Sequence, residues 1–290
     1  MAIILSLVFT YAFLAVIFTA VSPAQAETYY TFTGGGHGHG AGMSMAGVSR
    51  LAKAGRDYPK IIKYYYKGVS VGRKGGLPSQ IRAAVHSTKG SLSFSADNHF
   101  RVYNTRNRYQ RTVNKGDIFS VRFTGSRYNL RVTRKGKTIW YKTSPLSLII
   151  KPWKASYLKL RNKNRRYKGN IYARSTGTSA IWAINKLPLS TYLKGLGEEP
   201  ESWPIKGLRT LAVASRTYAV QKIQKKSAHY DINQSQQFYV GIRKAPRMAY
   251  AVNSTRKAII TYKGKPIIAA YSANSGGYVA DFRTLWGGKG

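Results

Sequence analysis

The sequence contains no cysteine among its 290 residues. Disulfide bonds, thiolate metal sites and cysteine nucleophiles are therefore excluded, and the chain must rely on its core for stability. Acidic residues are also scarce, since nine Asp and Glu stand against 48 Lys and Arg, giving a formal net charge of +39. This excess is larger than solubility requires and predicts a polyanionic partner: nucleic acid, an acidic membrane surface or an anionic cell-wall polymer.

Charge is absent altogether from the first 26 residues, MAIILSLVFTYAFLAVIFTAVSPAQA, which end in Ala24-Gln25-Ala26. A long apolar run closed by a small-x-small pattern predicts export, either as a cleaved signal peptide or as a retained N-terminal anchor, since the run approaches the ~20 residues that span a bilayer. The basic residues usual before such a run are missing, and the first one is Arg50. Both alternatives place the rest of the chain outside the cytoplasm, secreted or wall-associated, and argue against genomic DNA as the partner.

Three further segments differ in pattern. Residues 27–69 begin with a loop rich in Gly and His and continue with the spacing of one or two short helices. Residues 70–180 consist of short alternating runs and are predicted to be β-rich. Residues 181–290 combine a helix capped by Ser202, with apolar residues on one stripe, and a last hairpin that turns at Lys263-Gly264. The sequence therefore predicts an α+β fold, with mixed short strands around a central helix and a basic β-rich segment beside it.

The basic residues are dense in and after the β-rich segment. Between Ile118 and Gly197 the chain contains no Asp or Glu and 18 Lys or Arg. Residues 128–141 alternate apolar and polar side chains around Lys135-Gly136, which predicts a hairpin. The cations have two interpretations that the sequence leaves open: solvated outer positions of strands, or an electrostatic funnel for an anionic polymer.

Carboxylates gather at one place, GLGEEPESWP (195–204), where Glu198, Glu199 and Glu201 fall within four positions. Glu201 precedes the predicted helix, and a carboxylate there stabilises the helix N-terminus. Glu198 follows a small-residue turn and is a candidate general acid. The basic background and the helix N-terminus both lower its pKa, so an acid role requires burial, for example under Trp203 or Tyr192.

Two other motifs carry reactive side chains. His37 and His39 alternate in a Gly-rich loop, an arrangement that is found at metal sites and, more often, in solvated loops; no third ligand is evident. Ser272 and Ser275 precede Gly276-Gly277, but no Gly-x-Ser-x-Gly elbow is present. We therefore interpret the serine loop as a substrate-binding turn and predict no metal.

Three stretches together resemble the SpoIID/LytB family of peptidoglycan lytic transglycosylases and amidase enhancers. They are INKLPLSTYLKGLGEEPESWPIKGLRTLAVASRTYAV (184–220), YDINQSQQFYVG (230–241) and AAYSANSGG (269–277). The first matches the family's Leu-Pro-Leu, Tyr-Leu-x-Gly, Glu-x-Pro, Ser-Trp-Pro and Ala-x-Arg-Thr-Tyr elements. The resemblance covers about 95 residues and implies a SpoIID-like catalytic core at 181–290, which we expect to be incomplete where the chain stops at LWGGKG.

A further piece, GHGHGAGMSMAG, looks like the Gly-His-Gly-x-Gly-Met-Ser-Gln element that often closes the family's domain, although here it stands near the N-terminus. His39 and Ser44 match that element, whereas His37 replaces an aromatic residue and Met45 replaces a Gln. We therefore expect residues 27–69 to include a displaced part of the same domain.

The resemblance assigns roles to particular residues. Glu198 matches the catalytic acid/base of Glu-x-Pro, and Glu199 falls on a variable position. The residues that match family motifs and are candidates for holding the glycan are Arg216, Tyr271, Ser272, Ser275, His39 and Ser44. The implied reaction cuts the bond between MurNAc and GlcNAc without water and leaves a 1,6-anhydro end. It needs no cofactor, and the zinc site of some relatives, which uses Cys and His, is not expected in a chain without Cys.

Two other functions remain open at this stage. A non-catalytic wall-binding protein that enhances an amidase is the main alternative, because some members of the family are described in that way. Its partners, like those of the enzyme, would be peptidoglycan strands and anionic wall polymers, with an amidase in addition. An exported nucleic-acid binder would need aromatic residues interleaved with Lys and Arg, of which KIIKYYYKG and NRRYKGNIYAR offer some. Export makes nucleic acid the less favoured partner.

Overall fold

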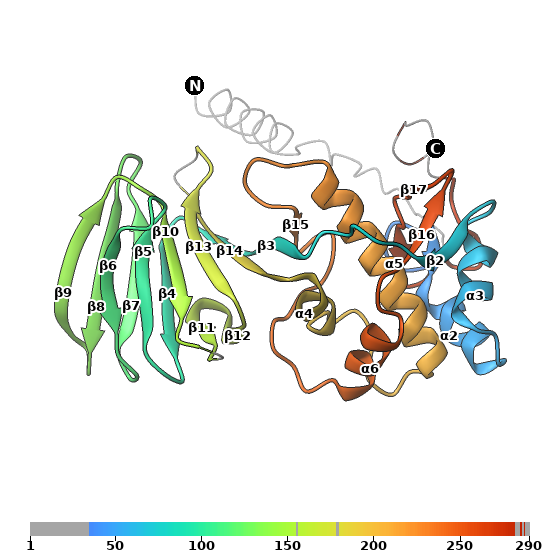
Figure 1. The fold of residues 1–290 in the computed structure, drawn as a ribbon, viewed down its shortest axis with the longest axis horizontal. Helices are drawn as coiled ribbons and strands as arrows, with labels where there is room; N and C mark the ends of the chain where they lie inside the picture. The colour runs from blue at the N-terminus through green and yellow to red at the C-terminus, as the bar shows by residue number, and fades with distance from the viewer. Residues whose placement is uncertain (1–34, 155, 178–179, 282–284, 286, 288–290) are drawn as a thin grey trace, which may run out of the picture. The chain divides into compact units, whose positions relative to one another are not determined.

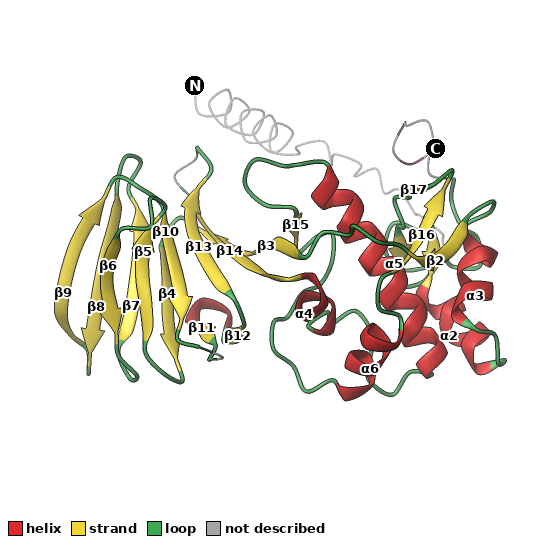
Figure 2. Cartoon of the chain, in the orientation of Figure 1, coloured by secondary structure: helices red, strands yellow, loops and turns green. Residues whose placement is uncertain are grey.

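The structure is a computed structural model that describes residues 35–154, 156–177, 180–281, 285 and 287. The segment predicted to be a signal peptide or anchor, residues 1–26, lies outside this part of the chain. The fold is α+β with mostly antiparallel sheets, which confirms the predicted class (Figures 1 and 2). The described residues include these helices: α2 (Met45–Lys53), α3 (Tyr58–Tyr65), α4 (Leu189–Lys194), α5 (Ile205–Gln224) and α6 (Pro246–Ser254).

The segment predicted to be β-rich forms most of two large sheets (Figure 1). The seven-stranded sheet contains, in spatial order, β15 (Ile232–Asn233), β3 (Gln80–Thr88), β14 (Ile181–Pro188), β13 (Asn170–Ser175), β10 (Leu148–Pro152), β5 (Phe100–Asn104) and β6 (Tyr109–Val113). The six-stranded sheet contains β12 (Arg165–Tyr167), β11 (Leu158–Leu160), β4 (Ser91–Ala96), β7 (Ile118–Phe123), β8 (Tyr128–Arg134) and β9 (Lys137–Ser144), and a short 3-10 helix, η1 (Arg161–Lys163), joins β11 to β12.

Alternating side chains build the core between the two sheets. In β4 the buried residues are Leu92 and Phe94, and in β5 they are Phe100 and Val102, so each strand contributes every second residue. The ring centroids of Phe100 and Phe119 lie 6.4 Å apart at an angle of 75°, which packs a strand of one sheet against a strand of the other. Two sheets joined by such contacts bury their apolar faces and leave the basic residues on the outer strand positions.

Both predicted hairpins are confirmed. Lys135 and Gly136 join β8 to β9 with φ values of 46° and 80°, and Lys263 and Gly264 join β16 (Ala258–Tyr262) to β17 (Lys265–Pro266) with 45° and 75°. Two consecutive positive φ values match the type I′ geometry that suits the twist of paired strands. β2 (Ser70–Arg73) pairs with β16, so the start of the predicted β-rich segment belongs to a three-stranded sheet with the C-terminal region.

Helix α5 is buried on nearly every side, packed by the other four helices and by β16. The predicted single apolar stripe is therefore wrong, because neighbours surround the helix and bury Thr210, Ser215 and Thr217 as well as its apolar residues. The predicted cap is also wrong: Pro204 occupies the N-cap position of α5, and Ser202 lies two residues before it. Proline can stand here because the first N–H groups of a helix have no partner within it.

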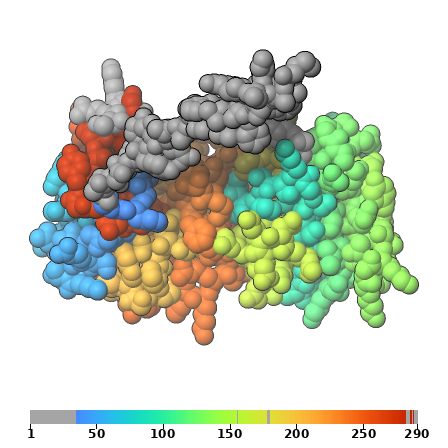
Figure 3. All heavy atoms as spheres, turned by 180° about the vertical axis from the view of Figure 1, so that it is seen from behind, coloured from blue at the N-terminus to red at the C-terminus, as the bar shows by residue number. Residues whose placement is uncertain are grey.

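The N-terminal glycine-rich segment lies beside the C-terminal serine loop, although about 230 residues separate them in sequence. β1 (Met43–Ser44) pairs in parallel with β18 (Tyr271–Ser272), and His37 forms an antiparallel bridge with Asn274. In Figure 3 the blue start of the described chain accordingly lies against its red C-terminal part. The backbone N–H of Met43 donates to the carbonyl of Ala270 at 3.0 Å. The piece that resembles a displaced domain element thus packs directly against residues of the 269–277 stretch.

Candidate active site around Glu198

The loop that carries Glu198 is held by a second loop, residues 237–241. The N–H of Gly197 donates to the carbonyl of Phe238 at 2.8 Å, and the N–H of Val240 donates to the carbonyl of Gly195 at 2.9 Å. A side chain at Gly195 would collide with the carbonyl oxygen of Gly241 and with the ring of Tyr239. The small-residue turn in the sequence therefore exists because two backbones approach each other closely.

Glu198 is half-buried, and one of its oxygens is fixed by two donors. The backbone N–H of Phe238 donates to Oε1 at 2.7 Å, and the hydroxyl of Tyr271 donates to the same atom at 3.1 Å. Within the described residues, Oε2 accepts no hydrogen bond from the protein. The carboxyl group is thus oriented through one oxygen, which leaves the other to carry a proton toward a ligand.

The electrostatic environment favours the protonated form of Glu198. Burial raises the pKa of Glu198, and the hydrogen bonds from Phe238 and Tyr271 offset part of this rise. Burial therefore has a larger effect on the pKa of Glu198 than the groups that lower it. Tyr271 and the backbone of Phe238 hydrogen-bond the carboxyl group, and burial, followed by the charge of Glu198, raises the pKa of Tyr192, one of the two residues expected to bury it.

A buried polar network supports Tyr271. Its hydroxyl is 3.0 Å from Ser215 Oγ on α5 and accepts from Gln237 Nε2 at 3.2 Å. Gln237 in turn accepts from the hydroxyl of Tyr192 on α4 at 3.0 Å. Burial raises the pKa of Tyr271 well above its ordinary value, and the charge of Glu198 adds to the rise, so Tyr271 stays a neutral donor. Side chains from α4, α5 and the 237–241 loop therefore hold the hydroxyl of Tyr271 in place against Glu198.

Two pockets adjoin the residues that bind Glu198. Tyr271 lines a pocket of about 370 Å³ together with His39, Lys222, Lys225 and others. Phe238 lines a second pocket of about 510 Å³ together with His86, Lys163, Arg165 and others. Ser235 lines both pockets, so the two are neighbours. Each pocket contains cations and no carboxylate and includes one of the two residues that donate to Glu198, an arrangement suited to an anionic ligand.

Glu199 and Glu201 differ sharply in environment. Glu199 is half-buried beside Glu198, and burial followed by repulsion from Glu198 raises its pKa to about 7. Glu201 accepts from the N–H groups of Arg247 and Met248, at 2.8 and 3.1 Å, in the first turn of α6. Its predicted role at a helix N-terminus is right in kind, but the helix is α6 and not α5.

Comparison with known proteins bears on the same residues. Residues 177–262 match the profile of the family described as SpoIID, stage II sporulation protein. This segment is a SpoIID domain. It contains β14, α4, α5, α6 and β16, and with them Glu198, Ser215 and Gln237. Tyr271 and the glycine-rich N-terminal segment lie outside the matched residues and pack onto the domain from the chain's two ends.

Two relatives extend the comparison. The chain is 32% identical over 111 residues to an uncharacterized protein of Brachyspira hyodysenteriae, covering 36% of this chain and 30% of the relative. It is also 32% identical over 96 residues to the amidase enhancer of Bacillus subtilis, covering 32% of this chain and 13% of the relative. The chain thus spans less than a third of the length of either protein and is a distant homologue of the second. No solved structure matches it significantly.

The structure brings Tyr271 together with Glu198, and the serine candidates join the N-terminal segment to the 269–277 stretch. Ser44 caps α2, accepting from the N–H of Gly47 at 3.4 Å, and also accepts from the N–H of Ser275 at 3.4 Å. Ser272 is the strand partner of Ser44, and its buried hydroxyl has no hydrogen-bond partner among the described residues. His39 accepts from the N–H of Ala41 through Nδ1 and lines the smaller pocket together with Tyr271. Of these candidates, His39 is therefore the one that lines a pocket beside Tyr271.

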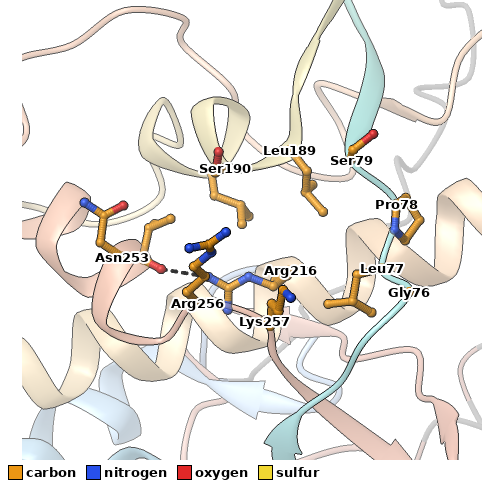
Figure 4. A pocket seen from close by; sticks show the side chains of 12 residues that line it. Gly76, Leu77, Pro78, Ser79, Leu189, Ser190, Arg216, Asn253, Arg256 and Lys257 are labelled. Atoms are coloured by element: carbon orange, nitrogen blue, oxygen red, sulfur yellow. Dashed lines mark hydrogen bonds between the residues drawn. The ribbon is translucent and has the colours of Figure 1, made fainter.

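Arg216 lies elsewhere on the SpoIID domain. Its guanidinium is buried and donates to the carbonyls of Val252 and Ala258, at 3.0 and 2.9 Å, where α6 ends and β16 begins. It lines a different cavity of about 720 Å³, which also contains Arg256 and Lys257 (Figure 4). None of the residues that line this cavity donates to Glu198. The contacts of Arg216 thus join α5 to α6 and β16.

Phe238, Gln237 and Ser215 were not identified from the sequence. Phe238 acts through its backbone N–H, which no side-chain pattern indicates. Gln237 lies in QSQQFYVG, a stretch recognised for its resemblance but without a role for each residue. Ser215 interrupts an apolar helix pattern, and that interruption is the signal that would have found it, because a lone hydroxyl on a buried face needs a partner.

The metal hypothesis for His37 and His39 gains no further ligand. Among the described residues no group of three His, Asp or Glu side chains is placed to hold a metal ion. In the same part of the chain no helix has the length and hydropathy needed to cross a membrane.

Proposed function

We propose that this protein is an exported, cell-wall-associated lytic transglycosylase that cleaves the glycosidic bond between MurNAc and GlcNAc in peptidoglycan. Glu198 is the catalytic residue. The observation that carries the proposal is a carboxyl group with a pKa raised by burial, fixed through one oxygen by Phe238 and Tyr271, each of which lines a cationic pocket. The SpoIID domain and the homology to an amidase enhancer support a role in the wall.

In the first step Glu198 acts as an acid. The proton on Oε2 passes to the glycosidic oxygen as the bond from that oxygen to MurNAc C1 breaks, and GlcNAc leaves with a free 4-hydroxyl group. Phe238 N–H and Tyr271 then stabilise the carboxylate that remains, because both donate to Oε1. Hydrogen bonds to the charged form favour proton transfer away from Glu198 at the moment it is needed.

In the second step the same carboxylate acts as a base. The C6 hydroxyl of MurNAc attacks C1, a new C6–O–C1 bond forms, and the hydroxyl proton returns to Glu198. The products are a 1,6-anhydroMurNAc end and a GlcNAc end, and no water is consumed. One carboxyl group suffices because the nucleophile belongs to the substrate, whereas hydrolases of the two-carboxylate type must also activate water.

The test compares the parent protein with Glu198→Gln on purified peptidoglycan, both intact and stripped of stem peptides, and identifies soluble products by mass spectrometry. Gln keeps an oxygen to accept from Phe238 and Tyr271 but carries no transferable proton. Anhydro ends should form with the parent and fall by a factor of about 100 or more with the variant. Glu201→Gln is the matched control, because Glu201 contacts α6, and it should cut at the parent rate.

The homology to an amidase enhancer favours one alternative, a non-catalytic protein that binds the wall and stimulates an amidase. In that case neither the parent nor Glu198→Gln would release anhydro products, and both would bind the wall and raise the rate of an added peptidoglycan amidase equally. That outcome would refute the enzymatic proposal and leave the wall association intact.

A further inference from the structure

The outer face of strands β5, β6 and β10 carries a row in which two cations lie between aromatic rings, and this row lies apart from Glu198. We call it the β5–β10 ladder, and it consists of Tyr109, Tyr103, Lys151, Arg101, Trp153 and His99. On β5, Arg101 and Tyr103 are two positions apart and so share a face. On β10, Lys151 is the direct strand partner of Arg101.

Each member of the ladder contacts the next. The rings of Tyr109 and Tyr103 are 5.9 Å apart at 72°. Lys151 Nζ lies 4.5 Å from the ring centre of Tyr103, and Arg101 lies 4.7 Å from that of Trp153. The ring of His99 lies 4.5 Å from Trp153.

The pairing of Arg101 with Lys151 is unfavourable for the protein alone. Like charges directly opposite each other on a sheet destabilise the pair of strands. The ion pairs within the described residues involve Arg82, Arg134, Lys206 and Arg243, so neither ladder cation has a carboxylate partner there. A bound anion between the two cations would relieve this repulsion, in a segment with very few acids of its own.

The rings make the two cations ready to bind. A cation held over an aromatic face loses less side-chain freedom when it meets a ligand, so the entropic cost of binding is lower. Lys151 and Arg101 each cover one face of a ring, that of Tyr103 and that of Trp153 respectively. Stacking of nucleic-acid bases requires free ring faces, so the ladder suits a ligand that offers anionic groups rather than bases.

We propose that the β5–β10 ladder is a binding site for an anionic cell-wall polymer, whose phosphate or carboxylate groups lie between Arg101 and Lys151. It is a docking surface separate from Glu198. Through it the basic β segment binds the polymer at defined residues, whereas net charge alone would attract the polymer without a defined contact. Because binding here needs no bond cleavage, the site stands or falls independently of the transglycosylase reaction.

The experiment measures binding of the full protein to purified cell walls by co-sedimentation, in the Glu198→Gln background so that no wall is digested. Arg101→Gln with Lys151→Gln removes the ladder cations. Lys137→Gln with Lys142→Gln removes two exposed cations from β9 and is matched in charge. The ladder variant should bind about tenfold more weakly, equivalent to about 1.4 kcal/mol, and the β9 variant within about twofold of the parent.

Three comparisons decide the result. Repeating the measurement on walls from which phosphate-containing polymers have been extracted identifies the anion. If the difference in binding between the parent and the ladder variant disappears, the anion is phosphate. If that difference persists, the anion is a peptidoglycan carboxylate. Equal losses in the ladder and β9 variants would overturn the proposal, because net charge would then explain binding. The proposal would also be overturned if a single-stranded oligonucleotide displaced the protein from the wall and its binding depended on Arg101 and Lys151. The ladder would then be a nucleic-acid site.

Discussion

At the scale of single residues, three glutamates within four positions have three different environments. Glu198 is held by Phe238 and Tyr271, Glu199 is buried beside it without a hydrogen bond among the described residues, and Glu201 binds the start of α6. The sequence assigned Glu198 and Glu201 to distinct roles, the first through a resemblance and the second through helix electrostatics. It gave no reason for Glu199, whose environment depends on burial that local sequence does not encode.

Tyr271→Phe removes one of the two donors to Glu198. The hydrogen bond from Tyr271 lowers the pKa of Glu198, so its loss raises that pKa further. If Glu198 is the acid, the alkaline limb of the pH profile of kcat/KM should move to higher pH, and activity at neutral pH should fall about tenfold because the carboxylate formed in the first step is less stable. Release of anhydro products across a pH series checks this. The exposed Tyr262→Phe serves as control, and an unchanged profile for Tyr271→Phe would contradict the assigned contact.

Glu199 should make stability depend on pH. Its pKa is about 7 in the folded protein against an ordinary 4.5, so between these values the folded state binds more protons than the unfolded state. The free energy of unfolding therefore decreases as pH rises through this window. Glu199→Gln should remove that contribution and stabilise the protein at pH 8 by about 1 kcal/mol, after allowance for solvent screening of a half-exposed group. Urea unfolding of parent and variant at pH 5 and pH 8 measures it; equal pH dependence in both would rule it out.

At the scale of elements, helix α6 is fixed at both ends by side chains for which the sequence predicts other roles. Glu201 accepts from its first turn, and Arg216 donates to carbonyls where it ends. Local patterns predicted α5 and both Lys-Gly hairpins, since these depend on neighbouring residues. The contacts of Glu201 and Arg216 span more than 30 residues each, so local patterns could not identify their partners.

Arg216→Lys tests whether this residue joins helices or holds the glycan. Lysine cannot reproduce the fork of bonds from Arg216 to Val252, Ala258 and Thr255, and a buried cation with fewer partners is costly. The free energy of unfolding should fall by about 2 kcal/mol while KM for peptidoglycan stays within about twofold of the parent. Denaturant unfolding and steady-state kinetics measure the two quantities. A tenfold rise in KM at unchanged stability would instead favour the glycan role that the sequence predicts.

At the scale of the whole molecule, a net charge of +39 surrounds a site whose own chemistry needs only one carboxyl group. The scarcity of acids, together with the export that the sequence predicts, favours an anionic partner, and composition is sufficient for that prediction. Composition did not indicate where the contacts lie. The cations of the β5–β10 ladder come together only through the pairing of two strands that are distant in sequence, and each pocket joins its cations to residues far away along the chain.

The large positive net charge should increase the rate at which the protein associates with the wall and should leave the rate of the chemical step unchanged. Salt screens interactions beyond about 8 Å at physiological strength, so long-range attraction to an anionic wall weakens as salt increases. With purified sacculi as substrate, kcat/KM should fall at least tenfold between about 50 and about 200 mM salt, whereas kcat at saturating substrate should change less than about twofold, because proton transfer from Glu198 occurs within the bound complex. Glu198→Gln should bind sacculi with the same dependence on salt as the parent. A parallel loss in kcat would mean that salt disturbs the site itself. Binding of the wall by the charged surface and cleavage by Glu198 would then not be separate functions.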